Sequence, residues 1–379
     1  MLKTDSLLIH GSDEAHGFAE GAVNNPIYQS SVFESYTYED VRYIRFNNTP
    51  NQQELEHKMA NIEGTETAAV GGSGMAVISA ALLTLLQPGD RLLAQRVLYG
   101  GTLTFLKNEL EPLGITVDFV DGSTPDEWQQ ALTQDTKAFY CESITNPLIE
   151  VADLTSISQF CTTHNLVSIV DNTFATPINL TPQTLGFDIT LHSATKFLNG
   201  FSDVSAGVIA GKKEHIDPIR AKIKQYGAPL DPHSCYLLNR GLKTLSLRIN
   251  KHNQNALEVA NYLESHNGVR RVRYPGLASH PQYKTAQKLF DGYGGMLSFE
   301  IDGDGTQADS VIKQMKMITA APSLGGVESL VMRPAAISHS VIPKPEREKM
   351  GIKDELIRLS IGIEDSTDLI NDIEQALKI

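Results

Sequence analysis

The sequence predicts an α/β fold, with a mostly parallel sheet in its first part and a smaller α+β domain after it. From about residue 61, short apolar runs alternate with segments of helix length, which is typical of strand–helix–strand units. The run LVSIV at 166–170 is almost wholly apolar, as expected for a strand in a sheet covered on both faces. Beyond about residue 245 the regular alternation stops, which indicates a second unit.

Each expected element follows from its own run of residues. Residues 1–60 are expected to be irregular. Strands of the first sheet are expected at 67–72, 91–95, 116–121, 137–143, 166–172, 187–193 and 207–211. Helices are expected between them at 75–87, 102–114, 126–134 and 153–165.

A long helical stretch at 230–265 is expected to bridge the two domains. After it, strands are expected at 270–276, 294–302 and 356–365, and helices at 306–317 and 366–378. The predicted division is an N-terminal arm at 1–60, an α/β domain at 61–244 and an α+β domain at 245–379.

Composition and charge exclude several classes of protein. The chain of 379 residues is 41% hydrophobic and 20% charged, which is ordinary for a globular protein and excludes disordered and fibrous classes. The net charge of −13 argues against binding of nucleic acid or a membrane surface through bulk positive charge. The most apolar stretch, 75–87, is too short to span a bilayer, and the start of the chain lacks a signal-peptide core. We therefore expect a cytoplasmic protein.

The cysteines indicate neither a disulfide framework nor a metal site. They are Cys141, Cys161 and Cys235, an odd number at scattered positions, without paired Cys/His spacing. Small core residues in a reducing compartment are the favoured interpretation, and no metal is expected.

Candidate functional residues come after the expected strands, because ligands of parallel α/β sheets bind at the carboxyl ends of the strands. Ser73, Gly74 and Met75 open a long apolar helix after the first strand, where backbone N–H groups can bind an anion. Taken alone, this signal favours the structural interpretation, an N-cap serine followed by a turn glycine.

Two further strand ends carry polar groups. Asp171 ends a buried strand, where a carboxylate is costly unless it is paired, although a helix cap is an equal alternative. Ser193 and Thr195 precede Lys196 after another strand, so two hydroxyls could bind a phosphate beside an amine. A surface lysine next to a polar turn is the alternative for this segment alone.

Together these features match the needs of pyridoxal phosphate. This cofactor requires a lysine amine for a Schiff base, a carboxylate that keeps the pyridine nitrogen protonated, and a cradle for its phosphate. An aromatic side chain over the ring would help, and Tyr99 comes after the strand at 91–95 at the same edge.

The strand near the C-terminus adds a cation. Alternation in LIRLSIGI puts Arg358 on the face opposite Ile357 and Leu359, toward a possible cleft. A guanidinium suits bidentate capture of an α-carboxylate. A structural salt bridge is the alternative.

At this point the motifs resemble a known family, the Cys/Met-metabolism enzymes that use pyridoxal phosphate. These motifs cover nearly the whole chain in the family's order: SGM at 73–75, YGGT at 99–102, TNP at 145–147, VDNTF at 170–174, SATKFLNG at 193–200, SLGGVES at 323–329 and LIRLSIGIED at 356–365. The resemblance implies an aspartate-aminotransferase-like fold (fold type I). It also implies a homotetramer made of two catalytic dimers, with a small sulfur amino acid as substrate.

The resemblance also assigns roles. Lys196 would form the Schiff base and move protons, Asp171 would pair with the pyridine nitrogen, and Tyr99 would stack on the ring and assist. The remaining cofactor contacts would come from Tyr43 and Arg45 of a neighbouring subunit, and from Ser73, Gly74, Met75, Asn146, Thr173, Ser193 and Thr195. The substrate carboxylate would be bound by Arg358 with Ser323, Asn146 and Tyr99.

The resemblance implies a carbon–sulfur lyase that cleaves the Cγ–S bond of cystathionine-like substrates. γ-Replacement on an acylated homoserine, as in cystathionine γ-synthase, is the second alternative, and β-cleavage the third. The chain departs from the family pattern at three places: an altered loop at 46–51, Phe201 in place of a histidine, and Pro322 in place of a glutamate. These departures leave the length and charge of the substrate open. They also leave open a non-catalytic protein that binds pyridoxal phosphate.

Overall fold

The large sheet of this protein has seven strands. The structure, a computed structural model, describes residues 2–11, 21–34, 36 and 41–378. The strands run in the order β1-β7-β6-β5-β4-β2-β3, and only β7 is antiparallel to its neighbours. Their bounds are β1 (Thr67–Gly71), β2 (Arg91–Gln95), β3 (Thr116–Val120), β4 (Thr136–Glu142), β5 (Val167–Asp171), β6 (Ile189–Ser193) and β7 (Gly207–Gly211). The predicted α/β class with a mostly parallel sheet is confirmed.

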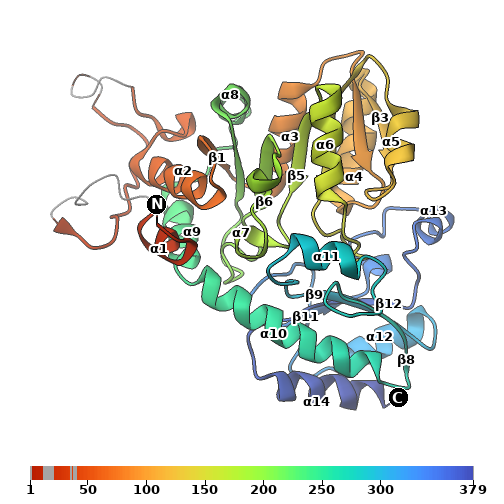
Figure 1. The fold of residues 1–379 in the computed structure, drawn as a ribbon. Coiled ribbons are helices and arrows are strands. Elements are labelled where there is room, and N and C mark those ends of the chain that lie inside the picture. Colours follow the sequence, from red (N-terminus) through yellow and green to blue (C-terminus); the bar gives the residue numbers. More distant parts are fainter. Residues whose placement is uncertain (1, 12–20, 35, 37–40, 379) are drawn as a thin grey trace.

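Helices cover both faces of this sheet (Figure 1). Side chains of β4 alternate between two apolar clusters, Phe139 and Cys141 in one and Ala138 and Tyr140 in the other. The first cluster is completed by α2 (Pro50–Glu63), α5 (Pro125–Ala131), α6 (Leu154–His164) and α9 (Pro232–Leu242), and the second by α3 (Gly74–Leu85) and α8 (Lys213–Gln225). Two short helices, α4 (Gly100–Phe105) and α7 (Thr176–Asn179), come after β2 and β5. Because both faces of the sheet are covered by helices, a ligand can reach the sheet only at the ends of its strands, where the polar residues lie.

A second sheet of five strands forms the C-terminal part. Its order is β10-β11-β12-β9-β8, antiparallel except between β10 and β11. The strands are β8 (Val269–Arg273), β9 (Met296–Ile301), β10 (Thr319–Ala320), β11 (Leu330–Met332) and β12 (Leu356–Ser360). The helices are α10 (Leu245–Glu264), α11 (Tyr283–Leu289), α12 (Gly305–Gln314), α13 (Lys344–Lys349) and α14 (Ser366–Leu377). Helices α10 and α14 lie side by side along this sheet (Figure 1), around a core that includes Phe299.

The expectation of an irregular segment at 1–60 is wrong in two places, α1 (Thr4–His10) and α2. Helix α2 begins with a capping box, in which Gln52 accepts a hydrogen bond from the backbone N–H of Thr49, and Pro50 fits the first turn. It ends at Gly64, whose φ of 65° is the left-handed conformation favoured at helix C-termini. Because α2 packs on β1 and α9, it is part of the main body of the chain.

The long helical stretch at 230–265 consists of two helices, α9 and α10, separated at Lys243 and Thr244. Their break lies at the predicted boundary at 244, but the division of the chain at 60 and 244 itself stays a prediction.

Helix α10 joins the two sheets through one buried polar face. Arg248 donates hydrogen bonds to the carbonyl oxygens of Phe197 (2.7 Å) and Leu198 (3.2 Å), in the turn after β6. One helical turn further on, His252 Nδ1 lies 2.6 Å from the carbonyl oxygen of Ile361, just after β12. The helix therefore fixes the ends of β6 and β12 relative to each other.

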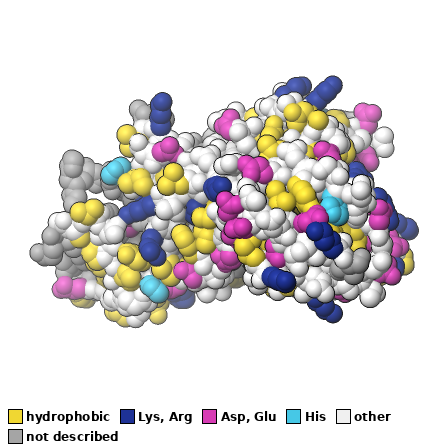
Figure 2. All heavy atoms as spheres, turned by 90° about the horizontal axis from the view of Figure 1, so that it is seen from below, with side chains coloured by type: hydrophobic (Ala, Val, Ile, Leu, Met, Phe, Trp, Pro, Cys, Tyr) yellow, Lys and Arg dark blue, Asp and Glu magenta, His cyan; other side chains and the backbone are white. Residues whose placement is uncertain are grey.

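The face of the molecule that Figure 2 shows carries charges of both signs, interspersed with apolar side chains. Within the described ranges, no helix has the length and apolar character needed to cross a membrane. The three cysteines are buried and free.

The C-terminal core offers a test of the packing. Phe299→Ala removes a fully buried ring from the small sheet, so we expect the free energy of unfolding to fall by about 3–5 kcal/mol. Urea denaturation measures this loss as a lower midpoint. The matched control is Leu247→Ala, which truncates a side chain that is 75% exposed and should change stability by less than about 0.5 kcal/mol. Equal effects of the two changes would contradict this core assignment.

Candidate active site

A cavity of about 560 Å³ opens where the carboxyl ends of the large sheet face the small sheet. It brings together all of the candidate residues from the sequence except two. The candidates around it are Ser73, Gly74, Met75, Tyr99, Asn146, Asp171, Thr173, Ser193, Thr195, Lys196, Ser323 and Arg358. The first ten come from the large sheet and its loops, and the last two from the C-terminal part, so the cavity lies between the two sheets.

One end of the cavity is built for an anion. Helix α3 begins here, and Ser73 caps it by accepting a hydrogen bond from Ala76 N at 3.1 Å. A Cβ on Gly74 would lie 2.8 Å from the Cβ of Ser193, so only glycine lets the helix start approach β6 this closely. First-turn N–H groups of a helix have no intrahelical partner and favour an anion. The hydroxyls of Ser193 and Thr195 line the same end.

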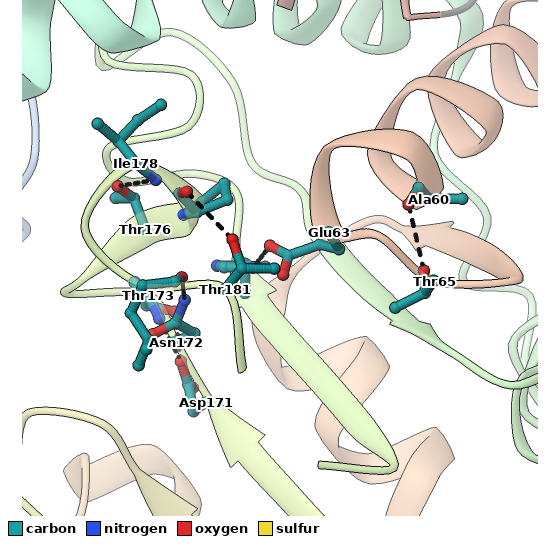
Figure 3. A network of polar contacts seen from close by, with 12 residues as sticks. Ala60, Glu63, Thr65, Asp171, Asn172, Thr173, Thr176, Ile178 and Thr181 are labelled. Carbon is teal, nitrogen blue, oxygen red and sulfur yellow. Dashed lines mark hydrogen bonds and ion pairs between the residues drawn. The ribbon is translucent and has the colours of Figure 1, made fainter. Parts of the chain in front are cut away.

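Asp171 is a buried carboxylate at the end of β5. Its Oδ1 accepts hydrogen bonds from both the backbone N–H (2.9 Å) and the hydroxyl of Thr173 (Figure 3). The Thr173 hydroxyl in turn accepts a hydrogen bond from Ser193 N at 2.8 Å. Burial raises the pKa of Asp171, and the hydrogen bonds from Thr173 oppose that rise. A carboxylate fixed in this way favours a neighbouring cation.

Lys196 lies in the turn after β6. Its Nζ donates a hydrogen bond to Ser323 Oγ at 2.8 Å. Burial, and then the nearby charge of Arg358, lower the pKa of Lys196 from 10.5 to about 8. With a pKa of about 8, roughly a tenth of the amine is neutral at pH 7 and can act as a nucleophile or base.

Arg358 faces the cavity from β12, as the strand alternation predicts. Its guanidinium donates to Asn146 Oδ1 (3.0 Å) and to the carbonyl oxygen of Ser323 (2.7 Å). Burial lowers the pKa of Arg358 to about 10, so it stays protonated at neutral pH. Its Nε is buried without a hydrogen-bond partner, and within the described chain neither Arg358 nor Lys196 forms an ion pair with a carboxylate. Arg358 therefore has no carboxylate partner among the described residues, which argues against the alternative of a structural salt bridge.

Ser323 joins these two cations. Its hydroxyl accepts from Lys196 and its carbonyl oxygen accepts from Arg358. Its φ of 100° is unfavourable for any residue other than glycine, at a cost of about 1–3 kcal/mol. Strained backbone of this kind is concentrated at functional sites.

Tyr43 and Arg45 are not among the residues around this cavity. Arg45 donates to the carbonyl oxygen of Lys224 at 3.2 Å, and the ring of Tyr43 lies 5.3 Å from that of Phe46. A role of these two residues in a neighbouring subunit stays a prediction. Of the residues that depart from the family pattern, Pro322 lines the cavity, whereas the ring of Phe201 lies 5.5 Å from the Arg248 guanidinium.

Three polar residues of the cavity, Glu142, Ser205 and Ser338, were not expected from the sequence. Glu142 is the last residue of β4, so the same search for polar groups at strand ends would have found it. The residues that form an apolar wall, Met332 and Ile337 among them, were missed as well. They come after no expected strand, and nothing in their sequence pattern indicates a cavity.

The residues present fit pyridoxal phosphate. The anion site at α3 suits the phosphate, Asp171 suits a protonated ring nitrogen, and Lys196 supplies an amine of lowered pKa. The free Nε of Arg358 leaves a donor for a carboxylate. The cavity would thus take the cofactor and an amino acid together.

Comparisons with known proteins agree with this fit. The family model for Cys/Met metabolism PLP-dependent enzymes matches residues 5–378. The chain is 41% identical to a cystathionine beta-lyase of Lactococcus lactis subsp. cremoris (strain MG1363) and 41% identical to a cystathionine gamma-lyase of Bacillus subtilis (strain 168), in both cases over 100% of each chain. It is 39% identical to an L-methionine gamma-lyase of Fusobacterium nucleatum subsp. nucleatum, over 94% of each.

A solved structure is similar throughout. The crystal structure of cystathionine gamma-lyase from Lactobacillus plantarum, complexed with L-serine, has a TM-score of 0.94 to this chain at 36% identity. The match covers 99% of this chain and 98% of that one. The aspartate-aminotransferase-like fold expected from the sequence is thereby confirmed.

The lowered pKa of Lys196 can be measured directly. In full-length protein freed of cofactor, competitive acylation followed by mass spectrometry should give a titration midpoint near pH 8 for Lys196, against ~10.4 for an ordinary lysine. The amine is protonated, and hence unreactive, below that midpoint. Arg358→Met should move the midpoint upward, because it removes a neighbouring positive charge. An ordinary midpoint, or one that Arg358→Met leaves in place, would contradict the electrostatics described above.

Proposed function

The chain belongs to the Cys/Met metabolism PLP-dependent enzymes, and from this we propose that it binds pyridoxal phosphate and cleaves the Cγ–S bond of cystathionine-like amino acids. The family and the reported relatives are PLP-dependent carbon–sulfur lyases, so carbon–sulfur bond cleavage is the established class. The choice of the γ bond and of cystathionine goes further and is the proposal.

One observation is the main support for this proposal. An amine that is partly neutral at working pH, that of Lys196, is hydrogen-bonded to Ser323, which also binds Arg358. Ser323 therefore lies between the Lys196 amine, which would move protons, and the Arg358 guanidinium, which would bind a carboxylate. An α-amino acid whose carboxylate is bound by Arg358 would have its α-carbon close to the Lys196 amine.

The residues of the chain divide the work. When bound, pyridoxal phosphate binds the substrate amine and withdraws electrons from its α-carbon. Arg358 binds the substrate carboxylate, and Asp171 keeps the ring nitrogen protonated. Lys196 accepts the proton from the α-carbon and then moves a proton at the β-carbon, which lets the γ-substituent leave as a thiol. One water molecule is consumed in hydrolysis, which gives the other products, a 2-oxo acid and ammonia.

β-Cleavage becomes the second candidate, ahead of γ-replacement. The specific observation is the cystathionine beta-lyase of Lactococcus lactis, which matches this chain over its full length as well as the gamma-lyase of Bacillus subtilis does. Both reactions use the same base and the same carboxylate site, so they differ in which carbon loses the sulfur. The thiol released distinguishes them.

We also propose that the active assembly is a homotetramer of two catalytic dimers. Support comes from large apolar side chains exposed on the N-terminal segment of the single chain, with Val23 94% and Tyr36 98% exposed. Val32, Val41 and Leu2 are exposed in the same segment. Large apolar side chains exposed along one segment favour association with another chain. Tyr43 and Arg45 lie close to this segment, outside the cavity of their own chain.

The function is tested by incubation with cystathionine alone. We expect cysteine, a 2-oxo acid and ammonia from the wild-type protein, and no turnover from Lys196→Ala, because that variant lacks the base and the amine that binds the cofactor. Release of homocysteine would establish β-cleavage in place of γ-cleavage. Normal activity of Lys196→Ala would contradict the mechanism. Added cysteine and an acylated homoserine test γ-replacement in the same samples, and a protein that binds the cofactor without turnover would be a non-catalytic binder.

Arg358 gives a separate test of substrate binding. Arg358→Ala should raise the KM for the amino acid by about 10- to 150-fold, the equivalent of about 1.5–3 kcal/mol for a charge-assisted pair. Affinity for pyridoxal phosphate should change much less, since the phosphate site lies at α3. An unchanged KM would remove Arg358 from the substrate site.

A further inference from the structure

We propose that Glu142 is a positioning residue that fixes Tyr99 and, through Asn146, Arg358 in one mutual arrangement. The inference rests on the proposed function, because that function assigns the roles of Tyr99 and Arg358. Glu142 ends β4, is 5% exposed and lines the cavity. The mechanism above gives this buried carboxylate no part in moving protons or binding substrate.

Both oxygens of Glu142 bind backbone N–H groups of the site. Oε1 accepts from Tyr99 N at 2.6 Å, and Oε2 accepts from Asn146 N at 3.2 Å. Tyr99 comes after β2 and Asn146 after β4, and these two strands are parallel neighbours. One carboxylate therefore fastens together the two loops that leave the same edge of the sheet.

The chain of contacts continues from Asn146 to the rest of the site. Arg358 Nη1 donates to Asn146 Oδ1 at 3.0 Å, and Arg358 Nη2 donates to the carbonyl oxygen of Ser323 at 2.7 Å. Lys196 Nζ donates to the hydroxyl of Ser323. Glu142 thus links the backbone of Tyr99, whose ring is expected over the cofactor, to the guanidinium of Arg358, which is expected to bind the substrate.

The ionised carboxylate is the form that can serve both loops. Asp171 is its paired neighbour across β4 and β5, and burial together with this second carboxylate raises the pKa of Glu142. Such a placement is costly unless each oxygen has donors, and the N–H groups of Tyr99 and Asn146 are those donors. A glutamine at 142 keeps the size and one acceptor but turns an amide N–H₂ toward the other backbone N–H. Glu142→Gln therefore breaks one of the two attachments without emptying the space.

Hydrogen exchange of the full-length protein, with and without pyridoxal phosphate, tests the positioning independently of turnover. In Glu142→Gln we expect faster exchange in peptides that contain the amides of Tyr99 or Asn146. The matched control is Glu127→Gln on α5, which also removes a carboxylate acceptor of a backbone N–H, that of Asp121, and which is not among the cavity residues. Exchange at Tyr99 and Asn146 should stay at the wild-type rate in that control.

Kinetics give the second readout. We expect Glu142→Gln to lower kcat/KM by about 10- to 100-fold through both a higher KM and a lower kcat, with cofactor affinity near that of the wild type. Glu142→Asp keeps the charge but is too short to reach both N–H groups, so its kcat/KM should lie between those of Glu142→Gln and the wild type. If Glu142→Gln does not fold, the same exchange and kinetic measurements are made on Glu142→Asp. Wild-type exchange at both amides would overturn the proposal, whether or not activity changes, and so would unchanged kcat and KM. Failure of the proposed function would show differently, as absent turnover in the wild-type protein with the exchange result intact.

Discussion

The site depends on keeping two groups that can carry a positive charge, the amine of Lys196 and the guanidinium of Arg358, together in one cavity, where no carboxylate of the described residues forms an ion pair with either. Ser323 makes this possible, because one residue in an unfavourable backbone conformation offers its hydroxyl to the amine and its carbonyl oxygen to the guanidinium. Burial and the proximity of Arg358 lower the pKa of Lys196 to about 8, which makes a fraction of the amine neutral near neutral pH. The unsatisfied Nε of Arg358 leaves capacity for a ligand. A salt bridge at either position would remove these properties.

The fold supplies this arrangement by bringing two sheets together. Lys196 comes after β6 in the large sheet, whereas Arg358 lies on β12 in the small one. Helix α10 spans them, since Arg248 binds the carbonyl oxygens after Lys196 and His252 binds one just after β12. The positions of the amine and the guanidinium are therefore set by one helix as well as by Ser323.

Much of the site could be predicted from the sequence, because strand ends in a parallel sheet converge. Asp171, Ser193 and Lys196 are each the polar end of an apolar run or lie directly after one, and the structure places them around one cavity. Glu142, the last residue of β4, obeys the same rule and could have been found in the same way, although the sequence analysis did not single it out. Helix α2 was missed because its start depends on a local capping box at Thr49 and Gln52 rather than on an apolar period. The expected role of Tyr43 and Arg45 in the site stays a prediction, because within a single chain they do not line the cavity.

The central claim is that Lys196 is the residue that binds the cofactor covalently. The most direct measurement is to load the wild-type protein with pyridoxal phosphate, reduce it with borohydride and map the modified peptide by mass spectrometry. We expect a single pyridoxyl-modified lysine, Lys196, and no incorporation when the same treatment is applied to Lys196→Ala. Stoichiometric modification of another lysine, or no stable incorporation into the wild-type protein, would contradict it.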